Sequence, residues 1–114
     1  MKSFEKQFEE LKRFYPQAQR AFEGGIEFIL LNELELPPNC IPEKIDAVLC
    51  PTLSDGYQSR FFYEQQITGI PSKNWNGKKR ICDRNWVAYS WGAKPGLELL
   101  EMVRYHLYTL NCSR

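Results

Sequence analysis

The sequence predicts an α+β fold, with a helix near each end of the chain and an antiparallel meander between them. Three observations support this prediction. Apolar residues recur at helical spacing near both termini, short apolar runs of strand length lie between them, and glycine or proline pairs separate these runs. We expect both helices to pack on one side of the sheet. The chain has 114 residues, enough for one domain, residues 1–114, with a single core.

Both helices are indicated by the periodicity of their apolar residues. Near the N-terminus, three apolar residues recur every three or four positions with charged residues between them: Phe4, Phe8 and Leu11. Ser3 is the expected N-cap, and Pro16 requires this helix to end before it. The second helix is expected over residues 97–110, where leucine and valine recur at helical spacing after Pro95-Gly96.

The strands are indicated by apolar runs between turn residues. A short segment, residues 17–23, leads to a turn at Gly24-Gly25, and a strong strand follows from Ile26 until Pro37-Pro38 ends it. Two further strands are expected over residues 45–49 and 60–65. The polar, glycine-containing stretch of residues 68–88 predicts a long irregular loop, which its tryptophans hold against the core.

Charge and composition exclude several classes of function. The net charge is +1, so no basic field indicates binding to nucleic acid or to an anionic membrane surface. We find neither an apolar run of about 20 residues that would span a bilayer nor the apolar core of a signal peptide, and we expect a cytoplasmic protein. The four cysteines should then be reduced thiols. They form no CxxC pair and His106 is the one histidine, so no metal or other cofactor is expected.

Three motifs occur in a fixed order along the chain. Leucine, proline, glycine and tyrosine are spaced along residues 49–57, and Asn74 lies eight residues before Cys82. Trp91 follows Cys82 by nine residues and closes a run that reads Trp-Val-Ala-Tyr-Ser-Trp. Pro95-Gly96 and the C-terminal helix come next.

In this order and spacing the motifs resemble those of the ubiquitin-conjugating enzyme superfamily, over nearly the whole chain. The run that contains Trp91 is similar to a bacterial branch, the prokaryotic conjugating-enzyme-like family E. Genes of that family lie beside genes for an activating enzyme, a ubiquitin-like protein and a metallopeptidase, in operons linked to antiphage defence. The sequence departs from the superfamily where Ser72 and Lys73 replace the histidine and proline before the asparagine, and where no proline pair follows Tyr57.

The resemblance implies a minimal ubiquitin-conjugating fold and an acyl transferase. Such an enzyme accepts the activated C-terminus of a ubiquitin-like protein from an activating enzyme and passes it to a lysine of a protein substrate. Cys82 stands where the family has its nucleophilic cysteine and would form a thioester. Ser90 stands at the serine of the bacterial family and would form an oxyester, for which its hydroxyl needs a base. Each residue also has a structural alternative, because cysteines are often buried and loop hydroxyls often bond nearby backbone.

Further roles follow from the same resemblance. Asn74, or Asn76 close by, would hold the oxyanion of the intermediate, Asp83 would orient the incoming lysine, and Tyr89 would line the acceptor groove. The activating enzyme would bind basic residues of the N-terminal helix: Lys2, Lys6, Lys12 and Arg13. A second hypothesis is a catalytically inactive module that binds a ubiquitin-like protein, and a third is an unrelated small α+β domain.

Overall fold

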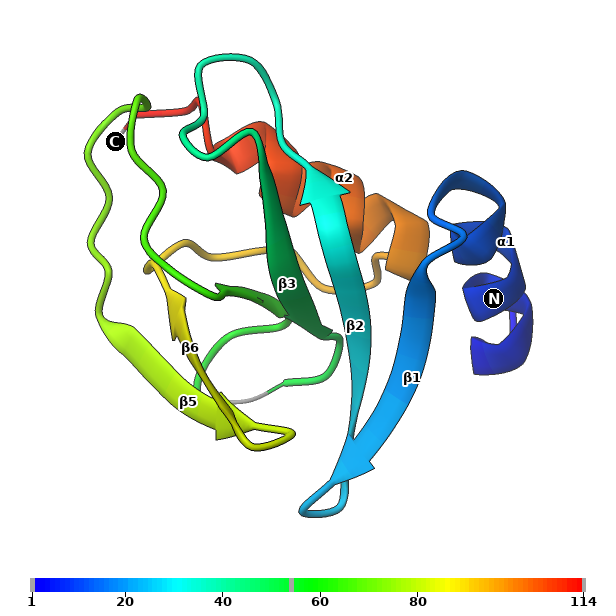
Figure 1. The fold of residues 1–114 in the computed structure, drawn as a ribbon. Coiled ribbons are helices and arrows are strands. Elements are labelled where there is room, and N and C mark those ends of the chain that lie inside the picture. The colour runs from blue at the N-terminus through cyan, green and yellow to red at the C-terminus, as the bar shows by residue number, and fades with distance from the viewer. Residues whose placement is uncertain (1, 54, 114) are drawn as a thin grey trace.

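The fold is a curled antiparallel sheet with one helix against its face and another beside its edge (Figure 1). The computed structural model describes residues 2–53 and 55–113. Along the chain the elements are α1 (Phe4–Phe14), β1 (Ala18–Glu23), β2 (Ile26–Glu35), β3 (Lys44–Cys50), β4 (Arg60–Tyr63), β5 (Gly77–Ile81), β6 (Arg84–Ala88) and α2 (Leu99–Thr109). The six strands lie in the order β1-β2-β3-β4-β6-β5, so the predicted α+β class is confirmed.

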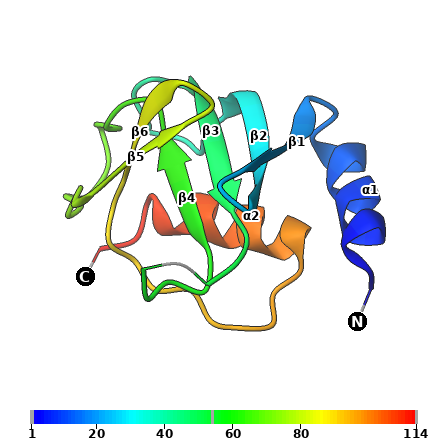
Figure 2. The same ribbon diagram turned by 90° about the horizontal axis from the view of Figure 1, so that it is seen from below.

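The helix α1 follows its sequence signals closely. The Ser3 hydroxyl accepts a hydrogen bond from the backbone N–H of Lys6 at 3.3 Å and caps the first turn, as predicted. The helix ends at Phe14, before Pro16, and Leu11 is fully buried. Figure 2 shows α1 beside β1, while α2 crosses one face of the sheet.

The strands β2, β3 and β4 form the predicted meander, and the short segment before the glycine pair is a further strand, β1. Gly24 and Gly25 have φ values of 60° and 77°, which a tight turn between β1 and β2 requires and which glycine adopts without strain. Between Leu31 and Leu34 the pairing of β2 with β3 shifts register, and Glu33 there has a φ of 51°. The strand β2 is therefore bent at a bulge, which contributes to the curl of the sheet.

The prediction of an irregular loop over residues 68–88 is wrong for residues 77–88, because these form the hairpin of β5 and β6. Cys82 and Asp83 connect the two strands with φ values of 52° and 62°. Asparagine and glycine usually occupy such two-residue turns, so the sequence carries no typical hairpin signal here. The strand β5 is an edge strand with a run of basic residues, which hides its apolar alternation.

Two clusters of buried side chains hold the sheet, one on each face. The larger cluster lies between the sheet and the helices and includes Leu11, Leu31, Tyr63 and Val103. The smaller cluster lies on the other face and includes Phe28, Val48, Phe62, Ile81 and Trp86. No helix in the described part of the chain has the length and apolar character needed to cross a membrane.

Candidate functional site

The β5–β6 hairpin brings Asn74 and Ser90 side by side. The chain enters β5 at Gly77 and leaves β6 at Ala88, so the segments just outside these residues meet at the open end of the hairpin. The backbone N–H of Ser90 donates to the carbonyl oxygen of Asn74 at 2.8 Å. Two of the residues singled out from the sequence thus form one site.

The same hairpin carries Cys82 and Asp83 away from this site. Both residues lie in the turn at the closed end, and the intervening strand β5 is five residues long. At a rise of about 3.3 Å per residue, the turn lies roughly 15 Å from the open end. The structure therefore does not place Cys82 beside Asn74.

Ser90 lines a small polar groove at the open end of the hairpin. The groove has a volume of about 260 Å³ and is lined by Ser72, Lys73, Asn74, Ser90 and Trp91. Ser90 is half-buried, and its Oγ accepts a hydrogen bond of 3.0 Å from the Tyr57 hydroxyl. The Lys73 ammonium lies 4.6 Å from the centroid of the Trp91 ring, which positions the aromatic wall of the groove.

A buried arginine supports Tyr57 from below this groove. Arg60 is 8% exposed, and the central carbon of its guanidinium lies 4.1 Å from the centroid of the Tyr57 ring. Its Nη2 donates to Oδ1 of Asn76 at 2.8 Å. The side chain of Asn76 is thus engaged, whereas Asn74 is exposed at the groove, so Asn74 is better placed of the two to meet a ligand.

Cys82 is exposed, as a carrier thiol must be, and an acidic side chain lies beside its backbone. Its backbone N–H donates to the carboxylate of Glu23, with 2.9 Å between N and Oε2. Arg84, one of the cations close to it in sequence, pairs instead with Asp46 at 3.1 Å and Glu64 at 3.2 Å. Asp83 is exposed in the same turn.

His106 is a hydrogen-bonded core histidine. It is 3% exposed, and its Nε2 lies 2.9 Å from Oγ of Ser59. Burial lowers the pKa of the imidazole to about 4, so the ring is neutral at physiological pH. The hydroxyl that contacts Ser90 is that of Tyr57, and His106 is engaged elsewhere.

Tyr89, which the resemblance would place at an acceptor groove, is a core residue in the structure. It is 5% exposed, and its hydroxyl lies 2.7 Å from Oγ1 of Thr109. Burial raises the pKa of this phenol to about 12. Its ring packs edge-on against Trp75 and Trp91, so Tyr89 supports the groove from inside.

The basic residues of α1 lie far from the groove. The helix lies beside β1 and the groove beside β5, at opposite edges of the sheet (Figure 2). Lys2 pairs with Glu10 and Glu98, and Lys12 lies 5.8 Å from the centroid of the Phe8 ring. Lys6 and Arg13 are exposed and are the two best placed to meet a protein partner.

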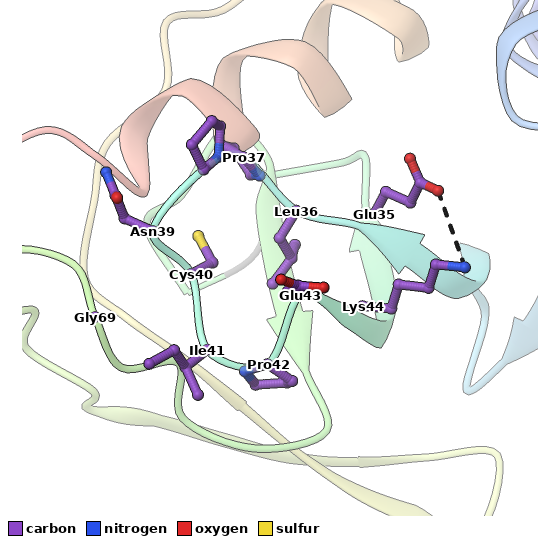
Figure 3. Close-up of a pocket in the computed structure, with 11 residues that line it drawn as sticks. Glu35, Leu36, Pro37, Asn39, Cys40, Ile41, Pro42, Glu43, Lys44 and Gly69 are labelled. Carbon is purple, nitrogen blue, oxygen red and sulfur yellow. Dashed lines mark ion pairs between the residues drawn. The ribbon is translucent and has the colours of Figure 1, made fainter.

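A wider hollow than this groove lies at the connection between β2 and β3. Figure 3 shows the connecting loop curving past Gly69, with the ion pair of Glu35 and Lys44, 3.9 Å apart, at one side. The volume is about 890 Å³. Cys40 in its wall is 4% exposed, and burial raises the pKa of that thiol. Over residues 2–53 and 55–113, no three histidine, cysteine or acidic side chains gather closely enough to hold a metal ion.

Sequence reasoning did not assign a role to Tyr57 or Arg60. The sequence signal was the place of Arg60 directly before the aromatic run Phe61-Phe62-Tyr63, and in the structure all four residues of this strand are buried. A charge at such a position is rare unless it is paired or functional.

Comparisons with known proteins do not extend the assignment. No family model matches the chain, and no curated protein or solved structure does so either. The resemblance to ubiquitin-conjugating enzymes therefore stays a prediction from the sequence motifs.

Proposed function

We propose that this chain is a bacterial conjugating enzyme that accepts the activated C-terminus of a ubiquitin-like protein from an activating enzyme and transfers it to a lysine. Ser90 is the proposed carrier. The observation that supports it best is the meeting of Ser90 with Asn74 in one polar groove, where the Tyr57 hydroxyl also contacts Ser90 Oγ at 3.0 Å. The cytoplasmic location and the role in antiphage defence belong to the same proposal.

The groove suits the two steps of acyl transfer. In the first step Ser90 Oγ attacks the thioester carbonyl on the activating enzyme, the O–C bond forms and the C–S bond breaks, and a thiolate leaves. In the second step the lysine amine attacks the resulting ester, the N–C bond forms and the C–O bond breaks, and the proton that the amine loses returns to Ser90 Oγ. Each step passes through an oxyanion, which the exposed amide of Asn74 would stabilise by a few kcal/mol.

Cys82 is the alternative carrier. Its exposure supports this role, because the thiol is open to an activating enzyme. The distance between Cys82 and the groove counts against this role, because a thioester on Cys82 would lie near neither Asn74 nor Ser90. Asp83 would then be the nearest group available to orient the incoming lysine.

A second candidate function is a non-catalytic module that binds a ubiquitin-like protein. One observation favours it: Ser90 Oγ accepts a hydrogen bond from Tyr57, and the one histidine is buried against Ser59 rather than beside the serine. A hydroxyl without a base is a poor nucleophile.

Intact mass spectrometry separates these proposals. The wild type, Ser90→Ala and Cys82→Ala are incubated with ATP and with the activating enzyme and ubiquitin-like protein encoded by neighbouring genes. We expect an adduct that survives reductant, is released by hydroxylamine and is lost only in Ser90→Ala. As a control, the activating enzyme must form its own thioester with the tag.

Other outcomes have definite meanings. An adduct released by reductant and lost only in Cys82→Ala would move the carrier to Cys82. An adduct that never forms, beside an activating enzyme that passes the control, would support the binding module and refute the proposed enzyme.

A further inference from the structure

We propose that Tyr57 is a catalytic residue that takes the proton from Ser90, and that Arg60 is a positioning residue that holds Tyr57 and stabilises its phenolate form. The inference rests on the proposed role of Ser90 as nucleophile. It supplies the base that the groove otherwise lacks.

The contact between Tyr57 and Ser90 is the first support. The two hydroxyl oxygens lie 3.0 Å apart, within the reach needed for proton transfer. Tyr57 comes from the connection between β3 and β4, and Ser90 follows β6, so the fold joins segments that are 33 residues apart. Both side chains are half-buried, which leaves the pair accessible from the groove.

The burial of Arg60 is the second support. In the described part of the chain, the guanidinium forms no ion pair, and its Nε has no hydrogen-bond partner although the atom is buried. Burying a charge without a counter-ion costs several kcal/mol, so stability does not explain the arginine. A positive charge held without an anion can instead stabilise the phenolate form of Tyr57, the form that acts as a base.

The surroundings of Arg60 fix the guanidinium against Tyr57. Its Nη2 is held by Asn76 at 2.8 Å, and its central carbon lies 4.1 Å from the Tyr57 ring centroid. Gly77 permits the close approach of β5, since a Cβ at that position would lie 2.6 Å from Nη2. Two cations lie at the cluster: Arg60 at the Tyr57 ring, and Lys73 at the Trp91 ring beside Ser90.

The proton and the electron pairs balance in this scheme. The scheme starts from the phenolate of Tyr57, whose proton has passed to water, and the hydrogen bond is reversed so that Ser90 donates. Ser90 Oγ then attacks the thioester carbonyl while its proton moves to the Tyr57 oxygen. The C–S bond breaks, and the departing thiolate takes the proton from Tyr57, which restores the phenolate. The reaction needs no oxidant or reductant.

A serine-directed fluorophosphonate tests this inference without the conjugation partners. The rate of adduct formation at Ser90 is followed by intact mass and peptide mapping from pH 6 to pH 9, with Ser90→Ala to verify the site. We expect Tyr57→Phe to lower the rate about 100-fold, the lower range for a general base. Tyr105→Phe is the matched control, because it deletes a hydroxyl that donates to the Gly92 carbonyl at 2.9 Å, and its rate should equal that of the wild type.

Arg60 is tested in the same assay by the shape of the pH profile. The wild-type rate should rise with pH, because the phenolate of Tyr57 is the base. Arg60→Gln should move this rise to higher pH, and Arg60→Lys should restore part of the shift because it keeps the charge. A merely structural arginine would change the amplitude and leave the position of the rise unaltered. Melting curves show which variants are folded. If the Arg60 variants unfold, Tyr57→Phe still tests the role of Tyr57 as a base, because its labelling rate should no longer rise with pH.

Three results would overturn the inference: no labelling of Ser90 in the wild type, equal rates for Tyr57→Phe and Tyr105→Phe, or a pH profile that Tyr57→Phe leaves unchanged. Tyr57-dependent labelling without a tag adduct would refute the proposed function and keep the inference about Ser90. A tag adduct on Ser90 that forms equally fast in the wild type and in Tyr57→Phe would support the proposed function and refute the role of Tyr57 as a base.

Discussion

Protonation of His106 should destabilise the fold as the pH falls from 6.5 to 4. Burial lowers the pKa of the folded imidazole to about 4, whereas the unfolded chain has the ordinary value of 6.5. Above pH 6.5 both states are neutral and the stability is complete. Between the two values only the unfolded chain binds the proton, so stability is lost as the pH falls and the loss is complete below pH 4.

The magnitude follows from the two pKa values. At about 1.4 kcal/mol per pH unit, the full loss is about 3 kcal/mol, of which about 2 kcal/mol falls between pH 7 and pH 5. For a domain of this size, a change of that order corresponds to about 8 °C in melting temperature. Protonation would disturb the hydrogen bond between His106 and Ser59, 2.9 Å long, and the ring contact with Phe61.

Urea denaturation at pH 7 and pH 5 measures the effect in the wild type and in His106→Gln. Glutamine keeps a polar group that can bond Ser59 but does not titrate, and the carboxylates common to both proteins cancel in the comparison. We expect the wild type to lose about 2 kcal/mol more than the variant. Equal losses would refute the reasoning, as would a histidine ring signal in NMR spectra of the wild type that titrates near pH 6.5.

Two further predictions test the backbone of the turns. Cys82→Asn should raise the free energy of unfolding by about 0.5–1 kcal/mol, because asparagine tolerates the left-handed φ of 52° better than cysteine does. Urea denaturation measures the change, and a lower midpoint for the variant would contradict the left-handed conformation of this turn. Gly69→Ala should cost about 1–3 kcal/mol more than Gly25→Ala by the same assay. Both glycines have positive φ, but a Cβ at Gly69 would lie 2.1 Å from the Asn39 carbonyl oxygen, whereas at Gly25 it meets open space. Equal losses would show that the loop gives way.

Elements that are marked by single residues could be predicted from the sequence. Ser3 and Pro16 mark the two ends of α1, and Gly24-Gly25 marks the turn between β1 and β2, because capping and left-handed turns depend on single residue types. The β5–β6 hairpin was not predicted, because its turn lacks the residue types that usually mark such a turn. Its turn residues, Cys82 and Asp83, adopt the conformation that asparagine and glycine usually signal.

The candidate site could be predicted only in part. Asn74 and Ser90 came from the motifs, and the structure brings them together through the hairpin. The contacts among Tyr57, Arg60 and Ser90 could not be predicted, because they join three segments whose proximity depends on how β4, β5 and β6 pair. Local patterns contain no information on such pairing.

The hairpin also changes the meaning of the spacing that first pointed to Cys82. Eight residues separate Asn74 from Cys82, and in a folded loop that distance would allow the amide to reach the thiol. Here most of the interval is the extended strand β5, which separates the two residues instead of joining them. Ser90 lies farther from Asn74 in sequence but pairs with it across the open end of the hairpin. If the asparagine serves an acyl carrier in this fold, the residue within its reach is the serine, and Cys82 would need a different set of groups to stabilise its oxyanion.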